Sequence, residues 1–247
     1  MKCAVLVFGQ YRALDIAIKS WSFMDHFDCD FYVSTWSETH IKNEPYGINL
    51  KFPVTHELIE KYIPGAVVNI ENDPKVDNRT FNLMLYHWKK TIELLVQSNK
   101  EYDLIILTRF DNFFAHFDWS IIDKESFYSY GEHSKDYGDM VCPKSLSDFC
   151  FIGSPESIIK FVDRVELEPT DYLVDSHSYL SLIINELKLP FDLLTDLNII
   201  IIRPNCYNLH PMDHNYNTIK NLYFSWEYNN NNNINEKQIN YEVHISY

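Results

Sequence analysis

The sequence predicts an α/β protein in which a mostly parallel central sheet is flanked by helices. Two short apolar runs, Cys3–Phe8 and Leu104–Leu107, have the length and composition of strands that are buried on both faces. A further strand is predicted at Asp30–Trp36, and helical segments alternate with the strands, which indicates βαβ units and parallel pairing. The chain has 247 residues, of which 46% are hydrophobic, so it can form a substantial core. With no internal repeat and no strong linker, we expect a single domain over residues 1–247.

The first predicted strand runs directly into Gly9-Gln10-Tyr11-Arg12. A glycine at this position allows a tight turn and the close approach of a ligand to the backbone. Residues 13–24 have helical spacing and predict a helix whose N-terminus would favour an anion beside Arg12. An ordinary strand–turn–helix explains the segment equally well, because it matches neither G-x-G-x-x-G nor a P-loop.

The segment between the second strand and residue 110 is expected to contain two helices. The stronger prediction is Phe81–Ser98, where apolar residues recur at helical spacing and His87 is expected on the helix surface. The other elements expected here are a loop over 37–53, a short helix over 55–63 with Thr55 as its N-cap, and a strand over 67–70.

The apolar run Leu104–Leu107 stops abruptly at Thr108-Arg109-Phe110-Asp111. If the chain stays extended, Arg109 and Asp111 point to the same side, because side chains alternate along a strand. A cation and a carboxylate would then lie together at the carboxyl end of a central strand, where open α/β sheets bind ligands. The alternative is an ordinary salt bridge at a strand end.

The second half of the chain is predicted to contain further strands and helices. Ser154 followed by Pro155 is a good helix start, with Ser154 as the N-cap. The elements expected are strands over 147–153 and 198–202, and helices over 155–164 and 175–187. The asparagine run at 229–233 predicts a flexible surface loop.

Charge and cysteine content limit the classes of partner and compartment. There are 35 acidic and 21 basic residues, and the net charge of −14 argues against nucleic acid as a partner. The five cysteines are odd in number and form no C-x-x-C pair, which favours reduced thiols. The first apolar run is too short for a signal peptide, and no stretch approaches the ~20 apolar residues of a membrane span. We therefore expect a cytoplasmic protein, and the sequence does not fix its oligomeric state.

Several of these segments together resemble a known family over roughly residues 1–190. They are Gly9-Gln10-Tyr11-Arg12, the strand ending at Thr35-Trp36, Tyr86-His87-Trp88-Lys89-Lys90, Tyr102 to Asp111, and Ser147 to Ser154. In this combination the chain is similar to small glycosyltransferases of viral and bacterial polysaccharide and capsid-glycan biosynthesis.

The resemblance implies a GT-A-type, Rossmann-like fold. It implies a nucleotide-binding half over 1–115, followed by an acceptor-binding half and C-terminal tail over 116–247. The expected activity is transfer of a sugar from a nucleotide-diphosphate sugar to a glycan or another hydroxyl acceptor. If the protein is viral, it would act in the host cytoplasm.

In GT-A enzymes an Asp-x-Asp motif at a strand end usually holds a divalent cation against the diphosphate, and Asp111 stands where such a motif would be. Here the neighbouring positions are Arg109 and Phe113, so only one carboxylate is present. Mn²⁺ or Mg²⁺ on Asp111 is chemically reasonable, because Mg²⁺ is often held by one or two carboxylates with phosphate and water. Arg12 and Arg109 are the alternative source of positive charge.

Glycosyl transfer needs a donor site and, in an inverting enzyme, a base for the acceptor hydroxyl. Candidates for the base are Asp148, Asp175 and His177, although Asp175 reads equally well as an N-cap. His210 and His214 are candidates for a late metal ligand or for surface residues. The candidate donor-binding residues are Gly9, Gln10, Tyr11, Arg12, Trp36 and Arg109. Two of them, Tyr11 and Trp36, are interpreted either as rings that stack on the nucleobase or as core residues.

Two other functions compete with transfer to a glycan. A viral glycosyltransferase acting on modified DNA bases would share the fold, but the acidic composition disfavours it. A non-catalytic nucleotide- or glycan-binding module is favoured by the missing second carboxylate.

Overall fold

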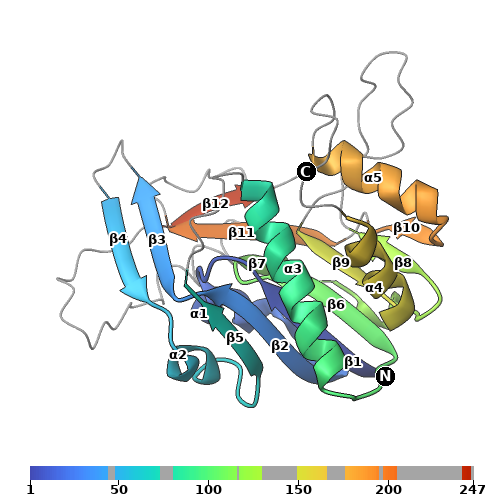
Figure 1. Cartoon of the computed structure of the whole chain (residues 1–247), viewed down its shortest axis with the longest axis horizontal. Helices are drawn as coiled ribbons and strands as arrows, with labels where there is room; N and C mark the ends of the chain where they lie inside the picture. The colour runs from blue at the N-terminus through green and yellow to red at the C-terminus, as the bar shows by residue number, and fades with distance from the viewer. Residues whose placement is uncertain are drawn as a thin grey trace.

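A computed structural model of the chain describes residues 1–43, 48–72, 80–115, 117–129, 149–165, 176–194, 197–204 and 241–245. Its centre is a seven-stranded sheet in the order β10-β8-β9-β6-β1-β2-β5 (Figure 1). The strands are β1 (Lys2–Phe8), β2 (Asp28–Trp36), β5 (Val67–Glu71), β6 (Leu104–Arg109), β8 (Phe127–Ser129), β9 (Cys150–Gly153) and β10 (Phe191–Leu193).

The sheet is mostly parallel. Among the described strands of this sheet, β5, β2, β1 and β6 are parallel to one another, whereas β9 runs antiparallel to the strands on either side of it, β6 and β8. The last strand, β10, pairs with β8 in parallel. The predicted α/β class, with a mostly parallel sheet flanked by helices, is therefore confirmed.

Helices cover both faces of this sheet. Side chains of β1 alternate between two apolar clusters, because successive residues of a strand point to opposite faces: Ala4 and Leu6 lie in one cluster, and Val5 and Val7 lie in the other. The cluster with Leu6 packs against α3 (Thr80–Gln97), α4 (Pro155–Arg164) and α5 (Ser176–Leu187). The cluster with Val5 packs against α1 (Leu14–Ala17), η2 (Ser22–Asp25), α2 (His56–Glu60) and η4 (Trp119–Ile121).

Helix α3 crosses the sheet in front of β1 and β2 (Figure 1) and contacts both strands. The predicted helix over 81–98 is thus confirmed to within a residue at each end. Its Trp88 is fully buried and meets Phe8 edge-on, with ring centroids 5.4 Å apart. The prediction that His87 lies on the helix surface is wrong: this side chain is buried and faces Ser34 of β2.

Helix α4 begins as its sequence predicts. The Ser154 side chain accepts a hydrogen bond from the Ser157 backbone N–H at 3.2 Å, and Pro155 occupies the first turn. Thr55 caps α2 in the same way, through the backbone N–H of Leu58. Both caps satisfy a backbone donor that the helix itself leaves without a partner.

Replacing Ser154 with alanine removes the cap of α4 and is expected to lower the free energy of unfolding by about 1 kcal/mol. Urea denaturation followed by circular dichroism measures this change. Ser154→Asp is the matched control, because an aspartate restores a side-chain acceptor at the N-cap. Equal stability of the alanine variant and the wild type would show that the cap contributes nothing.

The predicted helix over 13–24 is broken. The chain forms α1, then a 3-10 turn η1 (Ile18–Ser20), then η2, with Trp21 in a non-helical conformation between the turns. Tertiary contacts account for the break, because the Trp21 indole N–H donates to the Asn112 carbonyl at 2.9 Å and the Phe114 backbone N–H donates to Ser20 Oγ at 2.8 Å. Since α1 has only four residues, the expected anion site at a helix N-terminus has no support.

The described residues form two further sheets beside the central one. Residues 37–53 were expected to form a loop, but they contain an antiparallel pair, β3 (Glu38–Asn43) and β4 (Ile48–Pro53). A second small sheet has the order β12-β11-β7. Its strands are β7 (Asn112–Ala115), β11 (Asn198–Pro204) and β12 (Tyr241–Ile245). In the part of the chain that the structure describes, no helix is long and apolar enough to cross a membrane.

Candidate functional site

The order of the strands reverses beside β1. The connection from β1 to β2 passes through α1, η1 and η2 on one face, whereas α3 connects β5 to β6 on the opposite face. Strands β2 and β6 therefore flank β1 through crossovers on different faces. In open α/β sheets, ligands bind at the carboxyl ends of the strands at such a switch point. The segments that leave β1 and β6 at this edge are those that contain Arg12 and Arg109.

The segment after β1 is a tight turn. Gly9 has φ of 97°, which is the left-handed region that favours glycine, and its N–H donates to the Ser34 carbonyl at 3.1 Å. No described atom lies within 4 Å of the place where a Cβ would stand, so the backbone angle rather than crowding requires glycine here. Arg12 Nε donates to Gln10 Oε1 at 2.9 Å, and this hydrogen bond orients the guanidinium at the end of the turn.

Arg109 and Asp111 form an ion pair with two hydrogen bonds. Arg109 Nε lies 2.8 Å from Asp111 Oδ1, and a second guanidinium nitrogen lies 2.9 Å from Oδ2. The side chain of Asp111 is 2% exposed and that of Arg109 is 17% exposed. The predicted proximity of the two groups is confirmed, but a turn at Phe110 and Asp111 produces it instead of an extended strand. The Arg109 guanidinium also lies over the Phe149 ring, 5.2 Å from its centroid.

The two arginine-bearing segments contact each other through aromatic rings. Tyr11, from the turn after β1, packs against Phe110, which lies between Arg109 and Asp111, with centroids 5.4 Å apart. Both rings are buried, and the backbone carbonyl of Tyr11 accepts a hydrogen bond from Thr39. The rings therefore hold the Gly9–Arg12 and Arg109–Asp111 segments side by side.

Trp36, the other aromatic candidate for nucleobase stacking, is also buried. Its ring stacks on Tyr86 at 5.6 Å and meets the His87 ring at 4.2 Å. In this arrangement Tyr11 and Trp36 serve as packing residues, which is the alternative that the sequence left open for both.

The residues around Asp111 do not fit a divalent cation in this arrangement. Both carboxylate oxygens accept hydrogen bonds from Arg109, and the side chain is almost completely buried. Within the described ranges, no three His, Cys, Asp or Glu side chains lie close enough together to hold a metal ion. The positive charge near Asp111 is therefore that of a guanidinium.

A polar cluster that the sequence reasoning missed lies at the carboxyl ends of β2 and β5. We call it the His87 cluster, and it consists of Ser34, Asn69, Glu71, Tyr86 and His87. Ser34 Oγ lies 2.8 Å from His87 Nδ1 and 3.3 Å from Asn69 Nδ2. Glu71 accepts hydrogen bonds from Asn69 and from the Tyr86 hydroxyl. The sequence did contain a signal for this cluster. Polar residues stand at positions of β2, β5 and α3 whose side chains lie between the sheet and α3.

Burial and hydrogen bonding perturb the titration of this cluster. Desolvation lowers the pKa of His87 to about 4, and the negative charge of Glu71 opposes this shift only in part. Burial acts to raise the pKa of Glu71, but the hydrogen bonds from Tyr86 and Asn69 outweigh it and lower the pKa. His87 Nε2 is buried and has no hydrogen-bond partner among the described residues. The cluster thus holds a neutral imidazole beside a carboxylate.

The structure does not describe the predicted catalytic bases. Asp148 and Asp175 lie outside the described residues, as do His210 and His214. His177 is the second residue of α5, and its side chain is outside the described part. No contact therefore tests these assignments.

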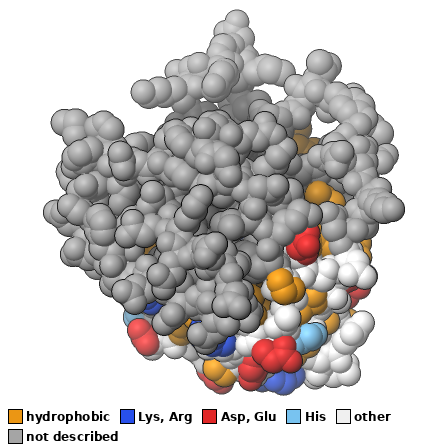
Figure 2. Space-filling view, turned by 90° about the vertical axis from the view of Figure 1, so that its left-hand side faces the viewer, with side chains coloured by type: hydrophobic (Ala, Val, Ile, Leu, Met, Phe, Trp, Pro, Cys, Tyr) orange, Lys and Arg blue, Asp and Glu red, His pale blue; other side chains and the backbone are white. Residues whose placement is uncertain are grey.

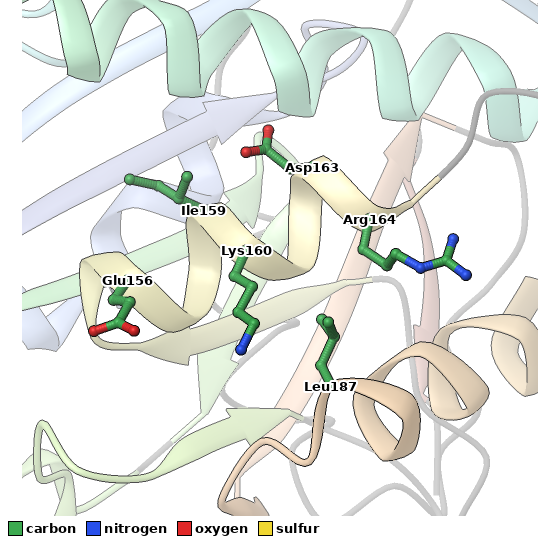
Figure 3. A pocket seen from close by; sticks show the side chains of 6 residues that line it. All are labelled: Glu156, Ile159, Lys160, Asp163, Arg164 and Leu187. Atoms are coloured by element: carbon green, nitrogen blue, oxygen red, sulfur yellow. The ribbon is translucent and has the colours of Figure 1, made fainter.

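A shallow open pocket of about 580 Å³ lies elsewhere, on the outer side of α4 and the end of α5 (Figure 3). Its charged side chains carry both signs, and Arg164 forms an ion pair with Glu186 at 2.8 Å. The residues that line it are Glu156, Ile159, Lys160, Asp163, Arg164 and Leu187. None of them belongs to the predicted site, so the pocket does not identify a donor site.

Figure 2 shows a face on which the described side chains include both acidic and basic groups. In the described part of this face, the basic side chains are interspersed with acidic ones instead of forming a continuous basic surface.

No model of a known protein family matches this chain, and a search of curated protein sequences found no similar one.

Proposed function

We propose that this protein is a glycosyltransferase that transfers a sugar from a nucleotide-diphosphate sugar to a glycan or another hydroxyl acceptor. One observation carries the proposal: two arginine-bearing segments, Gly9–Arg12 and Arg109–Asp111, are held side by side at the switch point by the contact of Tyr11 with Phe110. This edge of an α/β sheet is where such proteins bind nucleotides.

The arrangement of the sheet supports a fold of the GT-A type. A parallel nucleotide-binding half is followed by a mixed half, and here the parallel strands β5, β2, β1 and β6 precede the mixed strands β8, β9 and β10. The chain also enters a second sheet through β7, directly after Asp111. The ends of β1 and β6 therefore lie next to the half that would bind the acceptor.

Guanidinium groups supply the chemistry that a departing nucleoside diphosphate needs. Negative charge develops on the diphosphate as the glycosidic bond breaks, and oriented cations stabilise it. Gln10 orients Arg12 and Asp111 orients Arg109, so the protein fixes both groups before the donor binds. Arginine suits this role because its planar donors match phosphate oxygens. The proposed base for the acceptor hydroxyl comes from Asp148, Asp175 or His177 in the second half.

Replacing Asp111 with asparagine is expected to tighten the binding of a nucleoside diphosphate by about tenfold in the absence of divalent cations. The substitution removes a carboxylate near the proposed diphosphate and leaves the charge of Arg109 without its counter-ion. Isothermal titration with UDP, GDP and other nucleoside diphosphates, each with EDTA or with Mn²⁺, measures the effect. Asp163→Asn, on the exposed side of α4, is the matched control because it makes the same change in net charge.

The same titrations distinguish this guanidinium mechanism from one in which a cation on Asp111 holds the diphosphate. If Mn²⁺ strengthens binding to the wild type and Asp111→Asn abolishes this effect, a cation on Asp111 holds the diphosphate and the guanidinium mechanism is wrong. If no nucleoside diphosphate binds either protein under any condition, the donor site itself is wrong.

A non-catalytic nucleotide-binding module is the second candidate function. The observation that favours it is the complete engagement of Asp111 by Arg109, which leaves the described site without a carboxylate for a cation. Incubation with the nucleotide sugars of the bases that bind, without acceptor, separates the two functions. Slow release of nucleoside diphosphate indicates an enzyme, whereas a binding module returns the nucleotide sugar intact.

A further inference from the structure

Two cysteines lie directly opposite each other near the amino ends of the first two strands. Cys3 of β1 and Cys29 of β2 are paired in the parallel register. Both side chains point to the same face of the sheet, where Cys3 belongs to the apolar cluster of Val5 and Cys29 packs against it. Both are free thiols, with Cys3 buried and Cys29 partly exposed. The pair lies near the amino ends of these strands, whereas Arg12 and Arg109 lie at the carboxyl ends of β1 and β6.

The register brings the two residues within the range of a disulfide. Paired residues of neighbouring strands have Cα atoms about 4.8 Å apart, and the Cα atoms of a disulfide are usually about 4.4–6.8 Å apart. Because the side chains leave the sheet on the same side, the two sulfurs can meet without a change of register. The bridge would tie β1 to β2 and enclose the turn that carries Arg12.

The surroundings give the two sulfurs different reactivity. The side-chain interaction between the thiols raises the pKa of Cys3, and burial raises it further. The same interaction lowers the pKa of Cys29 despite its burial and its neighbours Asp28 and Asp30. Thiolates are the nucleophiles in thiol chemistry, so the more exposed sulfur is also the more reactive one. Cys150, in contrast, is fully buried, and burial alone raises its pKa.

We propose that Cys3 and Cys29 form a reversible disulfide when the protein meets hydrogen peroxide. The Cys29 thiolate attacks the peroxide, the O–O bond breaks, and hydroxide leaves to give a sulfenic acid on Cys29. The Cys3 sulfur then attacks the Cys29 sulfur, an S–S bond forms, and water leaves as the Cys3 proton is released. In the balanced reaction, two thiols lose two protons and two electrons, and one hydrogen peroxide becomes two waters. A dithiol reductant restores both thiols.

The test is peptide mapping of the folded protein after peroxide treatment, alkylation of remaining thiols and trypsin digestion. Cleavage after Lys2, Arg12, Lys19 and Lys42 places Cys3 in peptide 3–12 and Cys29 in peptide 20–42. The expected product is these two peptides joined with the loss of two hydrogen atoms, and dithiothreitol should separate them. The Cys150→Ala variant should give the same product, because its thiol takes no part in the reaction.

Two variants distinguish the steps. In Cys3→Ala, the sulfenic acid has no partner, so dimedone should label Cys29; in Cys29→Ala, the buried Cys3 should stay reduced. The proposal is overturned if the wild type stays folded by circular dichroism and gives no linked peptide, or if Cys29 pairs with another cysteine instead. Nucleotide binding takes no part in this reaction, so the proposal stands or falls separately from the glycosyltransferase function.

Discussion

Replacing Arg109 with methionine is expected to lower the free energy of unfolding by about 3 kcal/mol. The substitution leaves Asp111 as a carboxylate that is 2% exposed and has lost both of its hydrogen bonds to the guanidinium. Removing one partner of such a pair costs more than the pair contributes, because the remaining charge is desolvated without compensation. The contact of Arg109 with the Phe149 ring is lost at the same time.

A double-mutant cycle in urea separates the ion pair from packing effects. Arg109→Met with Asp111→Asn should recover most of the stability lost in Arg109→Met, since the double variant has no unpaired carboxylate. The Asn side chain keeps nearly the same volume as Asp, so it is a fair substitute. If the double variant is as unstable as Arg109→Met, packing rather than charge determines the effect.

Lowering the pH from 7 to 4 is expected to destabilise the protein by about 3 kcal/mol through His87 alone. The pKa of His87 is about 4 in the folded protein and 6.5 in the reference state, and each unit of this difference corresponds to about 1.36 kcal/mol. Between these pH values the unfolded chain binds a proton that the folded protein excludes. The contribution is therefore fully present above pH 6.5 and is lost as the pH falls toward 4.

Urea denaturation at several pH values, on the wild type and on His87→Gln, measures this contribution. The wild type should lose about 3 kcal/mol more than His87→Gln over this range, because glutamine does not titrate. His56→Gln is the control, since His56 is exposed at the start of α2 and belongs to no buried cluster. If the free energy of unfolding falls by the same amount in His87→Gln and in the wild type as the pH is lowered, the His87 imidazole is not excluded from water.

Local sequence patterns predicted the elements that depend on local rules. The α3 helix follows from apolar residues at helical spacing, and the start of α4 follows from Ser154 and Pro155. The turn at Gly9 follows from a glycine at a strand end, and its φ of 97° supplies the physical reason. The proximity of Arg109 and Asp111 was also predicted, although the alternation rule that suggested it assumed an extended chain.

Long-range contacts decided the features that the sequence misassigned. Residues 13–24 have helical spacing, but a continuous helix would lose the hydrogen bonds of Ser20 and Trp21 to the segment that begins β7. His87 looked like a surface residue because its burial depends on Ser34, which is 53 positions away in the chain. Neither contact leaves a periodic signal in the sequence.

By itself the sequence determined the α/β class, the main helices and strands, and the segments at the ends of β1 and β6 that carry the arginines. Only the tertiary structure decided which partner each charged or aromatic group would have. It paired His87 with Ser34, placed Tyr11 and Trp36 in the core, and brought Cys29 opposite Cys3. The physical reason is that periodicity records which side of an element is buried, whereas partners are set by strand order and register.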